Sequence, residues 1–129
     1  MGMLSSHLMF YQAVPKLIAI SKISRSEGNY FSEFLGTFIL VLAIWCLSKY
    51  HSKLIGLVVG MLVGGLLIAT SSTMFANPQV TFARIFTYAI AGVNPEDGIV
   101  FIFIEFLAAL VATGVATFLL KETQTTFRK

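Results

Sequence analysis

The polar residues best placed to do chemistry lie in one short stretch. Asn77 and Pro78 are followed by Thr81, Arg84 and Tyr88, which share one face of a helix that starts at Pro78. Asn77 suits the N-cap position and Pro78 suits the first helical position. The Asn77 amide then offers two N–H donors beside the partial positive charge of a helix N-terminus. The pattern predicts hydrogen bonding to a passing oxygen atom and repulsion of cations; a plain helix cap is the alternative.

Two carboxylates stand inside apolar sequence and need hydrogen-bond donors there. Glu33, with Thr37 one turn further on, is the acid of one apolar run, and Glu105 is the acid of another. We expect both to support structure, with Glu33 accepting from the backbone of a neighbouring non-helical link. A proton relay is the alternative. Arg84 is expected either to face a water-filled path or to form an anchoring ion pair with Glu33 or Glu105.

Composition excludes several other classes of site. Cys46 is the only cysteine, and His7 and His51 are far apart, so no disulfide, metal cluster or cofactor is expected. No Ser-His-acid grouping and no phosphate-binding glycine loop appears, which argues against an enzyme. The 129 residues are 57% hydrophobic and 12% charged, with a net charge of +3. Soluble domains carry about 25% charged residues. The chain therefore resembles a lipid-embedded protein and not a nucleic-acid binder.

The apolar runs predict an all-α membrane protein with three transmembrane helices and one re-entrant half-helix. The crossing helices are expected at 31–48, 54–71 and 99–120. The stretch 78–91 would rise only about 21 Å, which is too short to cross. Irregular chain at 72–77 and a short helix are tolerated at membrane depth where protein buries them or where they line a wet cavity.

Small residues and the two ends of the chain complete this organisation. Gly56, Gly60 and Gly64 recur every fourth position, which is typical of a helix face that packs closely against another helix. Residues 1–30 mix apolar and basic side chains and are expected to lie along the bilayer surface or to form an untethered tail. Residues 121–129 are expected to form a polar, basic tail.

Several of these segments resemble one known family. The run EFLGTF at 33–38 resembles the opening of a repeat in the major intrinsic protein family, the aquaporins and glycerol channels. The run NPQVT at 77–81 resembles the Asn-Pro-Ala-Val-Thr signature of that family, and 55–67 is similar to the second helix of a repeat. The resemblance covers about 31–120 and implies an aquaporin-like half-channel repeat.

In this family a complete channel holds two repeats in opposite orientation, and their half-helices meet at mid-membrane. The resemblance implies a passive channel for water or small neutral solutes such as glycerol, in the cell membrane, completed by a second, inverted half. The second half would be another copy of this chain or a separate chain. The residues implied at the pore are Asn77, Pro78, Gln79, Thr81, Arg84 and Gly65.

Four positions depart from the family pattern. Gln79 replaces the signature alanine, and Val80 stands where the filter arginine often follows the signature. Gly65 falls near a position that is often histidine in water-selective members, and Glu105 falls where glutamine is common. These differences argue against strict selectivity for water.

The distribution of basic residues bears on orientation. Three lie on the side of the N-terminal segment and five on the other: Lys16, Lys22 and Arg25 against Lys49, Lys53, Lys121, Arg128 and Lys129. Because Lys/Arg bias sets orientation, so small a difference permits insertion in both directions. Two other functions stay open, namely a proton-coupled exporter that works as an antiparallel dimer through Glu33 or Glu105, and a non-conducting assembly subunit.

Overall fold

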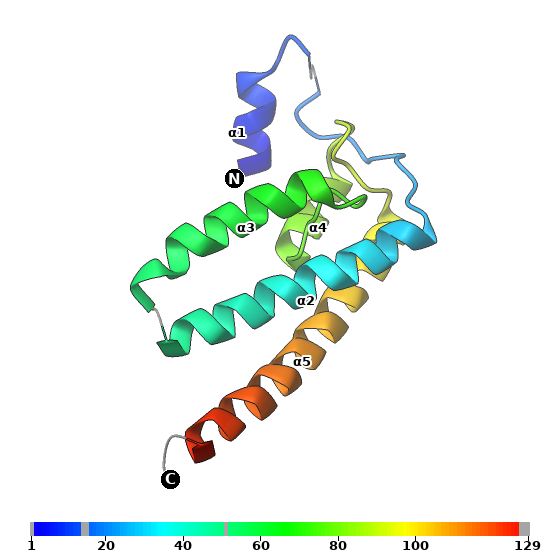
Figure 1. Ribbon diagram of the computed structural model, residues 1–129. Helices are drawn as coiled ribbons and strands as arrows, with labels where there is room; N and C mark the ends of the chain where they lie inside the picture. Colours follow the sequence, from blue (N-terminus) through cyan, green and yellow to red (C-terminus); the bar gives the residue numbers. More distant parts are fainter. Residues whose placement is uncertain (1, 14–15, 51, 127–129) are drawn as a thin grey trace.

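The structure, a computed structural model, describes residues 2–13, 16–50 and 52–126. Within these ranges the chain is helical and contains no strand (Figure 1). The last three residues of the expected polar tail, 127–129, lie outside the described ranges. The elements in chain order are α1 (Gly2–Met9), α2 (Glu27–Tyr50), the 3-10 helix η1 (Ser52–Leu54), α3 (Ile55–Ala69), α4 (Pro78–Ile85) and α5 (Pro95–Thr126).

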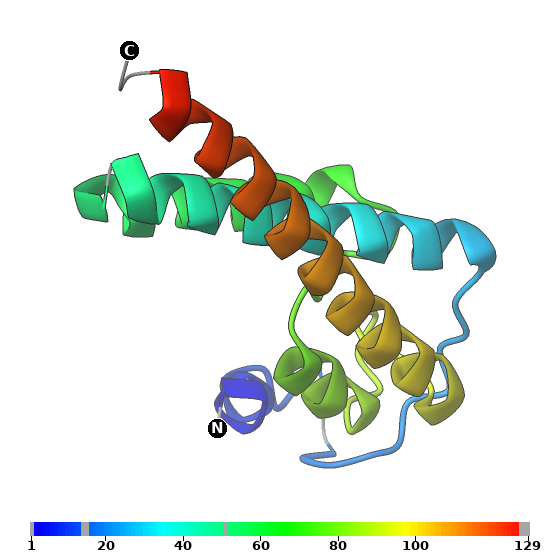
Figure 2. The same ribbon diagram turned by 90° about the horizontal axis from the view of Figure 1, so that it is seen from below.

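The two longest helices, α2 and α5, run in the same direction and cross at an angle (Figure 2). At their N-terminal ends the Tyr30 hydroxyl donates to Asp97 over 2.5 Å. Near their C-terminal ends the Trp45 indole N–H donates to the Thr113 hydroxyl over 3.2 Å. Both helices are long and apolar enough to cross a bilayer. By length and composition they are the two candidate membrane spans among the described residues.

Small side chains on α5 permit this close packing. Ala108, Ala112 and Ala116 are fully buried and recur at one-turn spacing on a single face. Towards the N-terminal end of α5, Phe101 joins an apolar cluster with three residues from the segment between α3 and α5, namely Phe75, Ile85 and Val93. The core therefore lies where that segment meets the first half of α5.

Both long helices begin earlier than the expected positions 31 and 99, because polar residues cap them. Asn29 accepts a hydrogen bond from the Ser26 backbone N–H over 2.9 Å, which closes the first turn of α2. Asn94 accepts from the Asp97 backbone N–H over 2.7 Å at the start of α5. These caps add a polar first turn to each span.

Helix α3 lies along α2 and is shorter than the expected crossing at 54–71 (Figure 1). Its 15 residues rise about 22 Å, less than the apolar core of a bilayer of about 30 Å. It ends at Ala69 because Thr70 is extended and its hydroxyl donates to the Leu66 carbonyl over 2.7 Å. The Asn29 side chain then donates to the Ser71 carbonyl over 2.8 Å, so the chain leaves α3 beside the start of α2.

Helix α4 ends at Ile85, six positions before the expected end at 91. The reason is that its last carbonyls are taken by other segments. Val93 N–H donates to the Arg84 carbonyl over 3.3 Å, and Ser21 N–H donates to the Ile85 carbonyl over 2.8 Å. These partners replace the intrahelical donors that further turns of helix would supply.

The N-terminal segment is joined to the same region. Ala19 N–H donates to the Phe86 carbonyl over 3.1 Å, and Asn94 N–H donates to the Ile23 carbonyl over 2.8 Å. Closer to the start, His7 on α1 is buried and lies 2.7 Å from the Thr87 hydroxyl. Residues 16–26 thus run along the exit from α4 and lead directly into α2.

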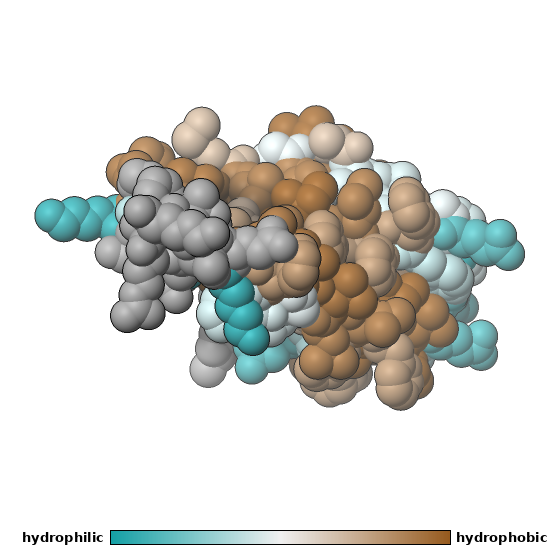
Figure 3. Space-filling view, turned by 60° about the horizontal axis from the view of Figure 1, so that its bottom comes forward, coloured by the Kyte–Doolittle hydropathy of each residue, from teal (hydrophilic) through white to brown (hydrophobic). Residues whose placement is uncertain are grey.

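Most of the large apolar side chains outside the core are exposed. Figure 3 shows apolar residues as one broad area across the middle of one face, with hydrophilic residues mostly towards its sides. On α3 none of the described side chains is buried, and Ile68 is 86% exposed. So large an exposed apolar surface is typical of a site that contacts a membrane or another protein.

We predict that Gly92→Ala destabilises the fold. A Cβ at this position would collide with the Thr87 backbone carbonyl and the Ser21 hydroxyl. Such overpacking costs about 1–3 kcal/mol. Thermal unfolding of the protein in detergent, followed by circular dichroism, should show a lower midpoint. In the control Gly114→Ala the new Cβ meets nothing within 4 Å, so its midpoint should not fall. Equal midpoints for both variants would contradict this packing.

Candidate functional site

The link between α3 and α4 adopts a strained backbone. Thr73, Met74 and Ala76 have φ values of 60°, 32° and 47°, a left-handed region that non-glycine residues rarely adopt. Each such residue costs about 1–3 kcal/mol. The conformation turns consecutive backbone N–H groups towards one point, where they can bind an anion.

Glu33 supplies that anion from α2. Its carboxylate is fully buried and accepts from the Phe75 N–H at 3.0 Å and 3.2 Å, one distance to each oxygen, and from the Ala76 N–H. Hydrogen bonds to a charged group contribute about 1.5–3 kcal/mol each, comparable to the strain. The link is therefore held at the depth of Glu33 by this side chain, the contact that the sequence led us to expect.

Glu105 holds the next part of the link from α5. Its Oε1 accepts from the Asn77 backbone N–H over 3.2 Å and from the Thr81 hydroxyl over 2.6 Å. Its Oε2 is buried and has no hydrogen-bond partner among the described residues, and the same is true of the Thr37 hydroxyl. The two carboxylates thus bind consecutive parts of the chain that leads into α4, Glu33 at residues 75 and 76 and Glu105 at Asn77.

Asn77 stands at the tip of this arrangement. Its backbone is extended, and its Oδ1 accepts from the Gln79 N–H over 2.9 Å, which makes it the N-cap of α4. The side chain is exposed, and its amide nitrogen donates to no described residue. The geometry leaves two N–H donors at the N-terminus of a helix whose position is fixed by buried carboxylates.

Arg84 lies behind the tip. Its guanidinium donates to the Thr73 hydroxyl over 3.2 Å and to the Ala91 carbonyl over 3.4 Å, and it lies 4.1 Å from the centre of the Phe75 ring. Glu33 attracts it electrostatically, but its hydrogen bonds go to Thr73 and Ala91. Arg84 therefore links the two ends of the segment 73–91 through these two hydrogen bonds.

The shared helix face expected for Thr81, Arg84 and Tyr88 does not extend to Tyr88. Helix α4 ends at Ile85, and the Tyr88 hydroxyl accepts from the Lys16 backbone N–H over 3.0 Å. Thr81 is fully buried and orients Glu105. Ile85, the last residue of α4, belongs to the buried cluster.

The remaining candidates lie on exposed surface. Pro78 is half-buried as the first residue of α4, and the exposed side chain of Gln79 follows it. Gln79 and Arg84 line a cavity of about 880 Å³ that α4 shares with α1. A Cβ added at Gly65 on α3 would meet nothing within 4 Å, and the same holds for the expected packing residues Gly56, Gly60 and Gly64. Within the described chain no helix occupies the glycine face.

Arg25 and Asp97 have structural roles that the sequence did not reveal. The Arg25 guanidinium donates to the Gly92 carbonyl over 2.7 Å and lies 5.5 Å from the centre of the Phe75 ring, so Phe75 contacts two guanidinium groups. Burial lowers the pKa of Arg25 below its ordinary value, and Glu33 and Asp97 oppose that shift. Asp97 accepts from the Arg25 backbone N–H over 2.6 Å. The signal available in the sequence was the acidic residue three positions after Asn94, a capping pattern.

A curated protein is similar to this chain over nearly the whole length of the chain. The chain is 31% identical to the aquaglyceroporin AqpS of Rhizobium meliloti (strain 1021) over 128 residues, which is 99% of this chain and 54% of that protein. The chain thus spans about half the length of the curated relative it matches. No family model and no solved structure matches it. The run at 33–38, the NPQVT run and an alignment over 99% of this chain agree, and the chain belongs to the major intrinsic protein family.

Proposed function

We propose that this chain forms half of a passive channel for water or small neutral solutes such as glycerol, in the cell membrane. The similarity to an aquaglyceroporin supports a channel and not an enzyme. The observation that carries the proposal is the Asn77 amide, exposed at the N-terminus of α4 and held there by Glu33 and Glu105. A neutral solute with an oxygen atom accepts from these donors, and the helix N-terminus opposes cations.

A re-entrant path for 72–94 is part of this proposal. The segment leaves α3 where Asn29 binds the Ser71 carbonyl, and it ends where Asn94 and Asp97 meet residues 23–30. Both ends therefore lie at the N-terminal end of α2. Between them Asn77 reaches Glu105, ten residues along α5 from Pro95, or about 15 Å from its start. These contacts support the proposal that Asn77 lies at membrane depth and that α3, although shorter than the apolar core of a bilayer, is the third crossing.

A second half is needed because the Asn77 side chain is exposed in a single copy of the chain. We propose an inverted second half, either another copy of this chain or a separate chain. The unoccupied glycine face of α3 and the exposed side chains at the start of α4 support such a contact. Gln79, Arg84 and Gly65 remain proposed lining residues, whereas buried Thr81 positions Glu105.

The exporter alternative gains no support. Glu33 already accepts hydrogen bonds from two backbone N–H groups, and Glu105 accepts from Asn77 and Thr81. Both carboxylates therefore already serve as acceptors for the link and the start of α4, which is the structural role expected for them.

The proposed channel makes a first prediction for the variant Asn77→Asp. Asp keeps the capping oxygen but removes both N–H donors and adds a negative charge, so the fold should persist while solute flux falls about five- to tenfold. Proteoliposomes containing the purified chain should swell in an inward glycerol gradient without any pH gradient, and the variant should swell slowly. Full flux in the variant would contradict the role of Asn77. No flux from the unaltered protein would contradict a channel made of copies of this chain alone, and would leave a separate second half or a non-conducting subunit.

A second prediction concerns Glu33→Gln. A neutral amide is a weaker acceptor and turns an NH2 group towards the Phe75 and Ala76 N–H groups, so the link should lose its conformation. We expect a loss of about 2–4 kcal/mol in stability together with loss of flux. The matched control is Glu27→Gln, an exposed acid in the first turn of α2, which should preserve both. Similar melting curves for the two variants would contradict the contact.

The third prediction concerns pairing. In a Cys46→Ser background, a single cysteine replacing Thr125 should be labelled by a membrane-impermeant maleimide from both sides of the membrane, because the lysine and arginine bias is small. Labelling from both sides supports inverted copies of this chain. Labelling from one side only would contradict inverted copies and leave a separate second chain as the other half.

A further inference from the structure

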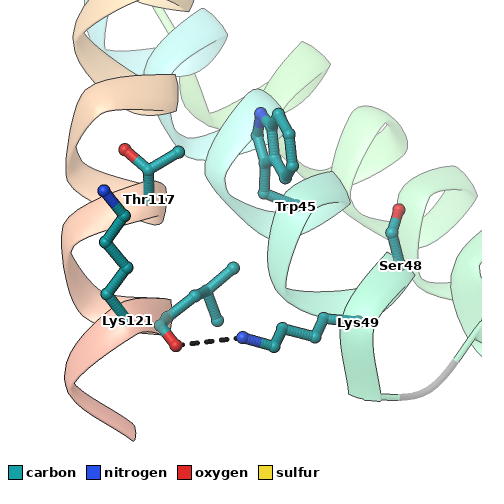
Figure 4. Close-up of a pocket in the computed structure, with 6 residues that line it drawn as sticks. Trp45, Ser48, Lys49, Thr117 and Lys121 are labelled. Atoms are coloured by element: carbon teal, nitrogen blue, oxygen red, sulfur yellow. Dashed lines mark hydrogen bonds between the residues drawn. The ribbon is translucent and has the colours of Figure 1, made fainter. Parts of the chain in front are cut away.

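A groove outside the proposed pore opens between the C-terminal halves of α2 and α5. It has a volume of about 390 Å³ and is lined by Trp45, Ser48, Lys49, Thr117, Leu120 and Lys121 (Figure 4). The two helices diverge here, so side chains from both face a shared space (Figure 4). None of these residues takes part in the arrangement around Asn77.

The charged side chains in the described lining of this groove are both basic. Ser48 donates to the Ile44 carbonyl over 2.7 Å, and Thr117 donates to the Gly114 carbonyl over 2.8 Å, so both hydroxyls are used within their own helices. Lys49 donates one N–H to the Leu120 carbonyl over 2.9 Å and retains two further donors. Among the described side chains the lining contains two lysines and no acid. The groove therefore combines apolar walls with two basic side chains, one from each helix (Figure 4).

The position of the groove along α2 and α5 indicates that it lies near the membrane–water interface. Lys49 lies one residue before the end of α2, and Lys121 ends the apolar span of α5. The Trp45 ring lies one turn inside Lys49, an order of aromatic and basic residues that is typical of the membrane–water interface. An occupant must therefore combine an anionic group at the surface with an apolar body that extends into the bilayer.

We infer that this groove binds an anionic phospholipid, with its phosphate at Lys49 and Lys121 and an acyl chain against Trp45, Thr117 and Leu120. Charge complementarity supports this occupant over a zwitterionic lipid, because the charged side chains in the described lining are both lysines. The inference requires that the chain be in a membrane, and it does not require that the chain conduct.

The test is a native mass spectrometry titration of the full chain in detergent with phosphatidylglycerol and, separately, phosphatidylcholine. The unaltered protein should bind phosphatidylglycerol more tightly. A lysine beside an anionic headgroup contributes roughly fivefold in binding, so K49A/K121A should weaken it by about 25-fold. The matched control K22A/K53A removes the same charge from exposed positions outside the groove and should bind as the unaltered protein does.

A second variant separates the groove from the charge. Thr117→Phe places a ring in the groove and keeps both lysines, so it should also weaken lipid binding. The inference is overturned if Thr117→Phe and K49A/K121A both bind normally, if the control loses binding equally, or if phosphatidylcholine binds as well as phosphatidylglycerol. Displacement of the lipid by millimolar inorganic phosphate would identify a site for a free anion and would also overturn it.

Discussion

The contact between the Glu33 carboxylate and the backbone of residues 75 and 76 is the constraint on which the functional region depends. A left-handed stretch of non-glycine residues is costly, and it persists here because its N–H groups converge on a buried anion. The same turn directs the Asn77 N–H to Glu105 and begins α4. Without the carboxylate the Phe75 and Ala76 N–H groups would lose their acceptor among the described residues.

The segment after α4 depends on a second set of contacts made by the N-terminal region. Backbone groups at 19–25 bind carbonyls at the end of α4 and Asp97 in the first turn of α5. The Phe75 ring contacts the guanidinium groups of both Arg25 and Arg84, which joins the link to both. The candidate site is thus assembled from the N-terminal segment, α2, the segment between α3 and α5, and α5, and each uses another to satisfy its polar groups.

Local chemistry made part of this arrangement predictable. The Asn77-Pro78 pair marked the start of α4 correctly, because an N-cap acts within its own turn. The depth of Glu33 and Glu105 within apolar runs indicated buried acceptors, and the family resemblance was confirmed by the curated relative. The end of α4 at Ile85 was not predictable, because the donors that replace its next turn come from residues 21 and 93. The contacts of Arg25 with the Gly92 carbonyl and the Phe75 ring were missed for the same reason, because these partners are distant in the sequence.

The unequal lengths of the helices affect the surrounding lipid. With 15 residues, α3 is much shorter than its neighbours α2 and α5, and none of its described side chains is buried within the chain. A short apolar helix beside long ones forces the lipids on its flank to thin or tilt, at a cost of fractions of a kcal/mol for each ångström of hydrophobic mismatch. That cost falls when protein instead of lipid covers the flank. In the proposed arrangement, with α3 in the membrane, the bilayer itself would thereby favour lateral association on the α3 side, even before any specific contact is made.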